Sequence, residues 1–291
     1  MAFGVIALIQ FEDVHFSYNT EESENETTPR SDGEVIKGLS FSIGSGEFVC
    51  ILGANGSGKT TVGKLINSLI LPVSGKIVID GLAPDSEENI LKIRQTVGMV
   101  FQDPSRQMVA STIEDELAFG PENLGVEPRE ILQRIDWALK ILDLESLRYR
   151  EPHYLSGGQT QRAAIAGVLV MQPKYIVMDE PTAMLDPKGR RSVLEAIDFL
   201  RAKLGLGIIY ITHHMEEVLR CDRVLGLKEG QLIFEGSPRD LFSEEATLKE
   251  LGLQVPPVIE LANLLRQRGC KLQQSLSWQE LCSALTSVWR N

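Results

Sequence analysis

The sequence lacks long apolar runs, paired cysteines and basic clusters, and each absence excludes a class of protein. No window among the 291 residues approaches about 18 consecutive apolar residues, so we expect no membrane-spanning helix. The four cysteines form no C-x-x-C pair, which predicts reduced thiols in a cytosolic chain. The formal net charge of −11 and the short Lys/Arg groups argue against nucleic acid as a partner. Residues 1–10 are apolar but lack a basic leader, so we predict no signal peptide.

A glycine-rich motif is present near the start of the chain. Residues 53–60, GANGSGKT, match the pattern G-x-x-x-x-G-K-[ST], and the apolar run Phe48–Leu52 before them predicts a strand. Glycines let backbone N–H groups face phosphate oxygens, and a helix expected over residues 59–71 presents its positive end to the same anion. The alternative, an ordinary Gly-Ser turn, fits this strand-helix context poorly. The predicted ATP-binding residues are Gly53, Ala54, Asn55, Gly56, Ser57, Gly58, Lys59, Thr60 and Thr61, with Lys59 at the β- and γ-phosphates and Thr60 on Mg²⁺.

An acidic pair follows a second apolar run. Residues 175–178 are typical of a buried parallel strand, and Asp179 and Glu180 come directly after them. Carboxylates at this end of a strand lie where ligands bind in open α/β sheets. We therefore predict that Asp179 orients Mg²⁺ through water and that Glu180 faces the attacking water. Alone, such a pair is more often a helix cap or loop device, but the upstream glycine-rich motif favours the catalytic interpretation.

A third motif, LSGGQ, occupies residues 155–159 between the other two. The three patterns together resemble the ABC ATPase family over approximately residues 9–237. In that family the serine and glycines bind the γ-phosphate of ATP held by a second cassette. The resemblance therefore implies a signature that acts in trans and consists of Leu155, Ser156, Gly157, Gly158 and Gln159. The same Ser-Gly-Gly also predicts a turn and helix cap before residues 161–170.

Four further positions fit the family pattern, and each is weak by itself. Tyr18 corresponds to the aromatic residue on which adenine stacks, although a lone Tyr at a strand end usually packs. Gln102 matches the Q-loop glutamine that contacts Mg²⁺ and the attacking water and senses the membrane partner. Asp186 matches the D-loop that couples the two sites. His213 matches the switch histidine at the γ-phosphate, and we expect His214 to be a solvated neighbour.

The resemblance implies an α/β fold, a P-loop NTPase cassette with a RecA-like core. Strand-like runs at residues 11–18, 35–43 and 76–80 predict its antiparallel β subdomain. Helical periodicity over residues 128–144 belongs to the helical signature subdomain, expected at about residues 103–165. We predict a nucleotide-binding domain at residues 1–240 and a C-terminal helical extension at residues 241–291.

Two segments have no assigned role. Residues 19–34 are acidic and lack apolar side chains, which predicts a mobile surface loop. Near the C-terminus a Ser-x-x-Glu capping box predicts a helix over residues 277–289. Its apolar stripe either packs on its own domain or forms a dimer interface, and the sequence leaves both open. The stripe consists of Trp278, Leu281, Leu285 and Val288.

Residues 97–126 are similar to the ATPase subunits of energy-coupling factor (ECF) transporters, which import vitamins and cobalt or nickel ions. Pro104, Gln107 and Met108 match the family segment that meets coupling helices of the membrane subunit, whereas Ser105 replaces an acid. The acidic residues 114–116 could receive the partner's arginines instead, or form a solvated face. The segment is more similar to the first of the two ATPase subunits of that family.

The resemblance implies an ATPase that uses ATP and Mg²⁺ at the cytoplasmic face of the cell membrane as a peripheral subunit. Its partners would be a second ATPase subunit, identical or paralogous, a transmembrane coupling subunit and membrane substrate-binding subunits. The nearest alternative is the ATPase of another ABC importer. A soluble, non-transport ABC ATPase fits less well, because the chain has one cassette and no heptad arms. The solute stays unidentified, since a separate membrane protein selects it in that family.

Overall fold

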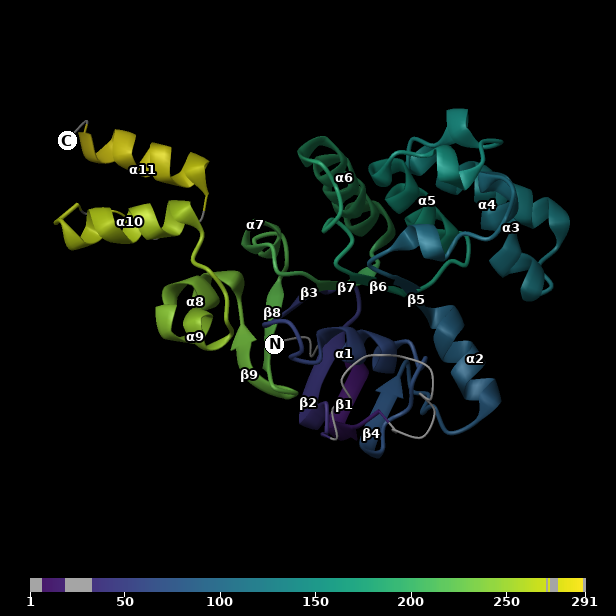
Figure 1. Cartoon of the computed structure of the whole chain (residues 1–291), viewed down its shortest axis with the longest axis horizontal. Helices are drawn as coiled ribbons and strands as arrows, with labels where there is room; N and C mark the ends of the chain where they lie inside the picture. Colours follow the sequence, from purple (N-terminus) through teal and green to yellow (C-terminus); the bar gives the residue numbers. More distant parts are fainter. Residues whose placement is uncertain (1–6, 19–32, 271, 273–276, 290–291) are drawn as a thin grey trace, which may run out of the picture.

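A computed structural model describes residues 7–18, 33–270, 272 and 277–289 (Figure 1). The acidic loop predicted at residues 19–34 lies outside the described residues except for its last two positions. All four cysteines are free thiols, and no helix within the described ranges is long and apolar enough to cross a membrane.

The central sheet has six strands in the order β5-β6-β7-β3-β8-β9. All neighbours pair in parallel except β8 and β9, which are antiparallel. Every residue of β3, β6 and β7 is buried, because structure covers both faces of the sheet. The buried parallel strands predicted before the glycine-rich motif and before the acidic pair are thus confirmed. The strands are β3 (Phe48–Leu52), β5 (Val97–Val100), β6 (Tyr175–Asp179), β7 (Gly207–Ile211), β8 (Arg223–Lys228) and β9 (Gln231–Gly236).

Two hydrophobic cores lie on opposite faces of this sheet. Alternate residues of β3 face each core: Val49 and Ile51 join one cluster, whereas Phe48, Cys50 and Leu52 join the other. The first core packs against α1 (Lys59–Ile66), α2 (Glu87–Thr96) and the second sheet. The second core lies under the longer helices on the opposite side (Figure 1). Those helices are α3 (Ile113–Asn123), α4 (Pro128–Ile141), α5 (Gly157–Leu169) and α6 (Pro187–Leu204).

The second sheet has three antiparallel strands in the order β2-β1-β4. They are β1 (Ala7–Phe16), β2 (Ile36–Gly44) and β4 (Ser74–Ile79). The antiparallel β subdomain is therefore confirmed, with strand ends within a few residues of those predicted.

Helix α1 is shorter than predicted. It ends at Ile66 rather than at residue 71, and Ser68 has the left-handed φ of 55°. The chain turns there because it must reach the second sheet, where the Val73 N–H donates to the His15 carbonyl at 2.9 Å. Leu69 and Leu71 continued the apolar pattern in the sequence, yet they are 41% and 45% exposed.

Helices α3 to α5 form a lobe beyond β5 and β6, as Figure 1 shows. Short 3-10 turns flank them: η2 (Pro104–Arg106) precedes α3, and both η3 (Glu145–Leu147) and η4 (Pro152–Tyr154) lie between α4 and α5. This lobe contains the helices predicted around the signature. The limits at residues 103–165 and the division at residue 240 remain predictions.

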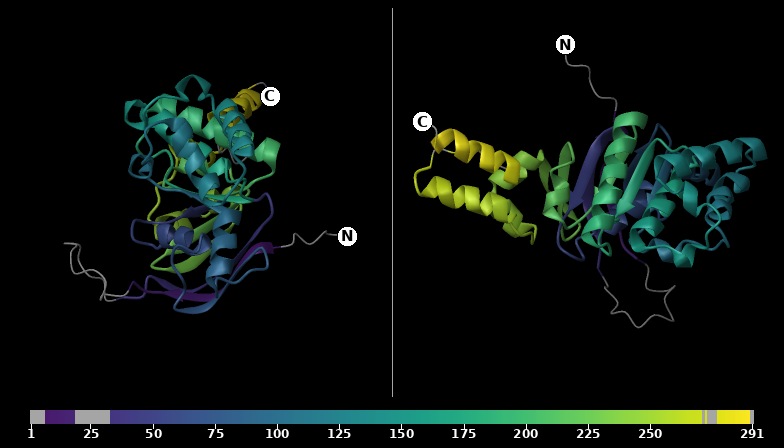
Figure 2. Two further views of the ribbon diagram at one scale, coloured as in Figure 1. Left: turned by 90° about the vertical axis from the view of Figure 1, so that its right-hand side faces the viewer. Right: turned by 90° about the horizontal axis from the view of Figure 1, so that it is seen from above.

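The C-terminal helices lie at the opposite end of the molecule from that lobe (Figure 2). The Ser277 hydroxyl accepts the Glu280 N–H at 3.2 Å, so the predicted capping contact is present. Leu281 is buried and Leu285 is partly buried, whereas Trp278 is 55% exposed, so the predicted stripe is not one buried face; the side chain of Val288 lies outside the described residues. The role of this stripe in a dimer stays a prediction. These helices are α8 (Pro238–Ser243), α9 (Glu245–Glu250), α10 (Pro257–Gln267) and α11 (Trp278–Trp289).

Candidate functional site

The loop between β3 and α1 forms one wall of the main pocket. Gly53 and Gly58 have φ values of 150° and 99°, which side chains disfavour. A Cβ on Gly53 would lie 2.1 Å from the Leu227 carbonyl oxygen, so this turn needs glycine. No side chain caps α1, so its first N–H groups remain available to an anion.

Lys59 opens helix α1 inside this pocket. It is 6% exposed, and its Nζ lies 3.0 Å from the carbonyl oxygens of both Gly53 and Ala54. Burial lowers the pKa of Lys59, and the charges of Glu180 and Asp179 oppose that shift. A desolvated ammonium at a helix N-terminus has strong attraction for phosphate, because little water screens it.

Thr60 and Asp179 meet at the base of the pocket. The Thr60 hydroxyl donates to Asp179 Oδ2 at 2.7 Å, which joins the start of α1 to the end of β6. Burial raises the pKa of Asp179, and the Thr60 hydrogen bond opposes it. A hydroxyl and a carboxylate are oxygen ligands of the kind that Mg²⁺ prefers. The described residues contain no group of three or more His, Cys, Asp or Glu that could hold a metal.

Glu180 lies between Gln102 and His213. Its carboxylate accepts from Gln102 Nε2 at 3.2 Å and lies 3.2 Å from His213 Nδ1. The structure thus brings together three residues that the sequence placed after three separate strands. The Glu180 backbone is left-handed at φ 46°, and its N–H donates to the Ile211 carbonyl at 2.9 Å. Such a backbone in a residue other than glycine is strained and occurs at functional sites.

The two adjacent histidines differ in their surroundings. His213 has an exposed side chain that faces Glu180, and its place at the γ-phosphate stays a prediction. The expectation that His214 is a solvated neighbour is wrong. Its ring is partly buried, with Nε2 3.3 Å from the guanidinium of Arg190. Burial lowers the pKa of His214, with Glu217 opposing the shift.

Tyr18 lies near the first turn of α1. Its hydroxyl is 3.3 Å from Thr61 Oγ1, its ring meets Phe16 edge-on at 4.8 Å, and the residue is 47% exposed. An accessible ring next to the glycine-rich loop suits a stacking partner for a base. The adenine contact itself remains a prediction.

The signature residues are not part of the lining of this pocket. Ser156 caps α5 through a capping box, in which its hydroxyl accepts the Gln159 N–H and the Gln159 side chain accepts the Ser156 N–H. The predicted cap is confirmed. In the described part of the chain, none of residues 155–159 lines the pocket. Asp186 likewise caps α6, accepting the Gly189 N–H at 2.7 Å. Roles in trans for the signature and in coupling for Asp186 stay predictions.

The predicted partner-coupling segment includes the turn η2. Gln107 and Met108 follow this turn and are partly buried, with Met108 packed against the core. Within residues 114–116, Glu114 pairs with Arg148, Glu116 accepts two backbone N–H groups and Asp115 is exposed. The run is therefore more than a plain solvated face, and its contact with a partner's arginines stays a prediction.

Three parts of the pocket wall were missed by the sequence reasoning. Arg190, Glu217 and residues 252–257 also line it. Glu217 lies on the short helix α7 (Met215–Val218), which begins after His213, so no helical spacing in the sequence linked the two residues. Arg190 and residues 252–257 carry no local pattern, since only the packing of distant segments places them there.

Comparison with known proteins identifies the family. A model of the ABC transporter family matches residues 36–183. The energy-coupling factor transporter ATP-binding protein EcfA1 of Clostridium perfringens is 45% identical over 282 residues, covering 97% of this chain and 98% of that protein. EcfA1 of Clostridioides difficile is 44% identical over 269 residues, covering 92% and 94%.

Solved structures agree with this assignment. The structure of cbiO1 from Clostridium perfringens, part of the ABC transporter complex cbiONQ, gives a TM-score of 0.74 at 36% identity over 89% of this chain and 99% of that one. The ATP-binding cassette MJ0796, dimeric in a post-hydrolysis state with ADP and Pi, gives 0.68 at 27% identity over 79% and 99%. The predicted fold class and ATPase activity are thus confirmed. The chain belongs to the ABC transporter ATPases and, among them, to the ATP-binding proteins of energy-coupling factor transporters.

Proposed function

We propose that this chain is the ATP-hydrolysing subunit of an ECF-type importer for vitamins or transition-metal ions. The observation that carries the catalytic part is the contact of Gln102 and His213 with Glu180, next to the buried ammonium of Lys59. The transport part is supported by identity along nearly the whole chain to ECF ATP-binding proteins.

The site residues have separate roles in this proposal. Lys59 and the N–H groups of the glycine-rich loop bind and orient the phosphates. Glu180 orients the attacking water or accepts its proton, and Gln102 and His213 hold the Glu180 carboxylate in place. Thr60 and Asp179 would hold Mg²⁺, whose charge stabilises the transferring phosphoryl group when it is bound.

Two cassettes close over two nucleotides in this proposal. None of the signature residues 155–159 lines the pocket of their own chain, so a second cassette would have to present its signature there. Ser156 and the N-terminus of α5 are exposed and can approach an anion. The partner cassette is a second copy or a paralogous ATPase.

The remaining partners are proposed from the family. Closure would pull the coupling helices of a transmembrane subunit, which would move a small substrate-binding membrane protein. Gln107 and Met108 are the proposed contact with that subunit. The chain would then act as a peripheral subunit at the cytoplasmic face of the membrane.

Affinity co-purification from membranes tests this proposal. The full tagged chain would be recovered, its partners identified by mass and the ATPase activity of the complex measured. We expect a second ATPase, a coupling membrane protein and small substrate-binding membrane proteins. Recovery of a conventional permease or of ribosomes would overturn the transport assignment and leave the ATPase chemistry standing.

A further inference from the structure

A buried carboxylate lies behind the catalytic groups of the pocket. Glu217 belongs to α7 (Met215–Val218) and is 2% exposed. Its Oε1 accepts from the Thr182 hydroxyl at 2.5 Å, and its Oε2 accepts from Tyr210 at 3.0 Å and Thr212 at 2.7 Å. Three hydroxyl donors therefore satisfy a carboxylate whose burial without partners would be costly.

These donors come from the two segments that carry the catalytic groups. Thr182 follows Glu180 by two residues, and the Ala183 N–H donates back to the Glu180 carbonyl at 3.1 Å. Thr212 directly precedes His213 and lies at the end of β7. The Glu217 side chain thus links Thr182, just after Glu180, to Thr212, just before His213.

We propose that Glu217 is a positioning residue for ATP hydrolysis, which fixes the spacing of Thr182 and Thr212 and so keeps Glu180 and His213 in contact. The inference rests on the catalytic roles proposed for those two residues. Errors of about 1 Å in such geometry can cost about 100-fold in rate. A buried hydrogen-bond network of this kind therefore affects turnover without contacting the reacting atoms.

The hydroxyl groups, rather than a cation, hold this carboxylate. Arg190 Nε is 3.8 Å from Glu217 Oε1, and it has no hydrogen-bond partner among the described residues. Burial, together with the charge of Glu217, holds the pKa of Tyr210 well above its ordinary value, so its hydroxyl keeps its proton and donates. A glutamine at position 217 keeps the volume but offers one acceptor oxygen for three donors.

Steady-state ATP turnover of the purified membrane complex tests the inference. We expect Glu217→Gln to lower kcat about 10- to 100-fold and to leave the KM for ATP unchanged. Thr212→Val, which removes one donor at equal volume, should lower kcat in the same direction, and Thr212→Ser should restore it. This pair keeps the test decisive if Glu217→Gln fails to fold. The control is Glu47→Gln, which breaks a distant carboxylate network and should lower thermal stability without lowering kcat.

A double-mutant cycle with Glu180→Gln separates positioning from general damage. If Glu217 acts through Glu180, adding Glu217→Gln to Glu180→Gln should cause no further loss of kcat. Multiplicative losses, or an unchanged kcat in Glu217→Gln, would overturn the inference. Wild-type turnover in Glu180→Gln alone would instead overturn the proposed site, so the two failures are distinguishable.

Discussion

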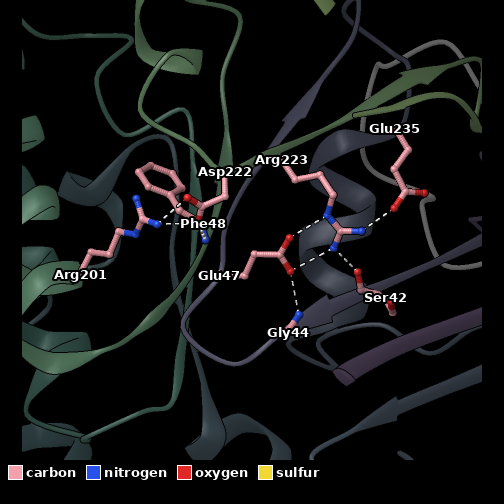
Figure 3. Close-up of polar contacts among 8 residues, drawn as sticks. All are labelled: Ser42, Gly44, Glu47, Phe48, Arg201, Asp222, Arg223 and Glu235. Carbon is pink, nitrogen blue, oxygen red and sulfur yellow. Dashed lines mark hydrogen bonds and ion pairs between the residues drawn. The ribbon is translucent and has the colours of Figure 1, made fainter. Parts of the chain in front are cut away.

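The two ends of the parallel strands hold their carboxylates in different ways. At the carboxyl ends, Thr60 donates to Asp179, Gln102 donates to Glu180, and hydroxyl groups donate to Glu217. At the amino ends the carboxylates are paired with guanidinium groups instead (Figure 3). The carboxyl ends thus combine hydroxyl and amide donors with His213 and the nearby cation Lys59, whereas the amino ends rely on guanidinium ion pairs.

The amino-end network joins separate parts of the fold. Glu47 accepts from Arg223 at 2.7 and 3.0 Å, and Arg223 also donates to Glu235 and to the Ser42 carbonyl of the second sheet. Asp222 accepts from Arg201 of α6 and from the Phe48 N–H at 3.0 Å. Figure 3 shows both carboxylates enclosed by donors. Guanidinium pairs suit a seam whose task is stability, whereas carboxylates held mainly by hydroxyl and amide groups remain available to Mg²⁺ and water.

The largest expected effect is at Glu180. We expect Glu180→Gln to lower kcat about 100- to 10,000-fold, because a glutamine amide cannot act as the general base. The side chain keeps nearly the same volume and can still form hydrogen bonds. ATP binding should persist, and the two cassettes should remain closed as a dimer. Turnover assays and size-exclusion chromatography with ATP check both points. Wild-type turnover in this variant would contradict the assignment of catalysis to the carboxylates at the carboxyl ends of the strands.

Lys59 is the cation at the carboxyl end, and its removal should affect binding rather than folding. Loss of its charge-assisted contacts should weaken ATP binding by about 10- to 100-fold in Lys59→Ala. Titration with a fluorescent nucleotide measures this. Lys228→Ala is a suitable control, because Lys228 forms an exposed pair with Glu250.

Arg223→Ala should break the amino-end network. It leaves the partly buried Glu47 and the exposed Glu235 without their cation, so we expect the free energy of unfolding to fall by about 1–3 kcal/mol. The kcat per folded complex should not change. Urea unfolding and the turnover assay, measured on the same variant, would test this. A large loss of kcat at unchanged stability would show that the amino-end network contributes to catalysis rather than to stability alone.

Asp186→Ala should cost about 1 kcal/mol of stability, because α6 loses its N-cap. Asp186→Asn retains a capping oxygen and should recover most of that loss. If the asparagine variant is stable yet hydrolyses ATP slowly, the deficit belongs to the proposed coupling role. Thermal unfolding and turnover of both variants provide the measurement.

Asp179 should give the smallest effect, a dependence of stability on pH. Burial raises its folded-state pKa, so its contribution to stability is present below the unfolded pKa and is lost as pH rises through the folded value. Asp179→Asn cannot ionise, so its stability relative to wild type should improve as pH rises from the unfolded pKa, about 4, through the raised folded pKa. If the difference in the free energy of unfolding between this variant and wild type did not change with pH, the charge of Asp179 would not destabilise the folded protein.

Local patterns predicted the groups that bind nucleotide. Gly53, Gly58 and Lys59 follow a recognisable strand, and Asp179 and Glu180 follow another, because backbone geometry at a strand end needs those residues within a few positions. The cap by Ser156 was predictable for the same reason. The end of α1 was not, since the apolar pattern continued while the chain had to turn toward the second sheet.

By itself, the sequence determined the family, the strands β3 and β6 and the candidate site residues, because local sequence patterns encode these features. Only the tertiary structure decided which of those residues meet. The order β5-β6-β7-β3 places Gln102, Glu180 and His213 side by side although about 110 positions separate the first from the last. It also buried Glu217 among hydroxyl groups and left Glu216 exposed. Glu216 and Glu217 are adjacent and identical, yet one is exposed and the other is buried, because burial depends on the packing of distant segments.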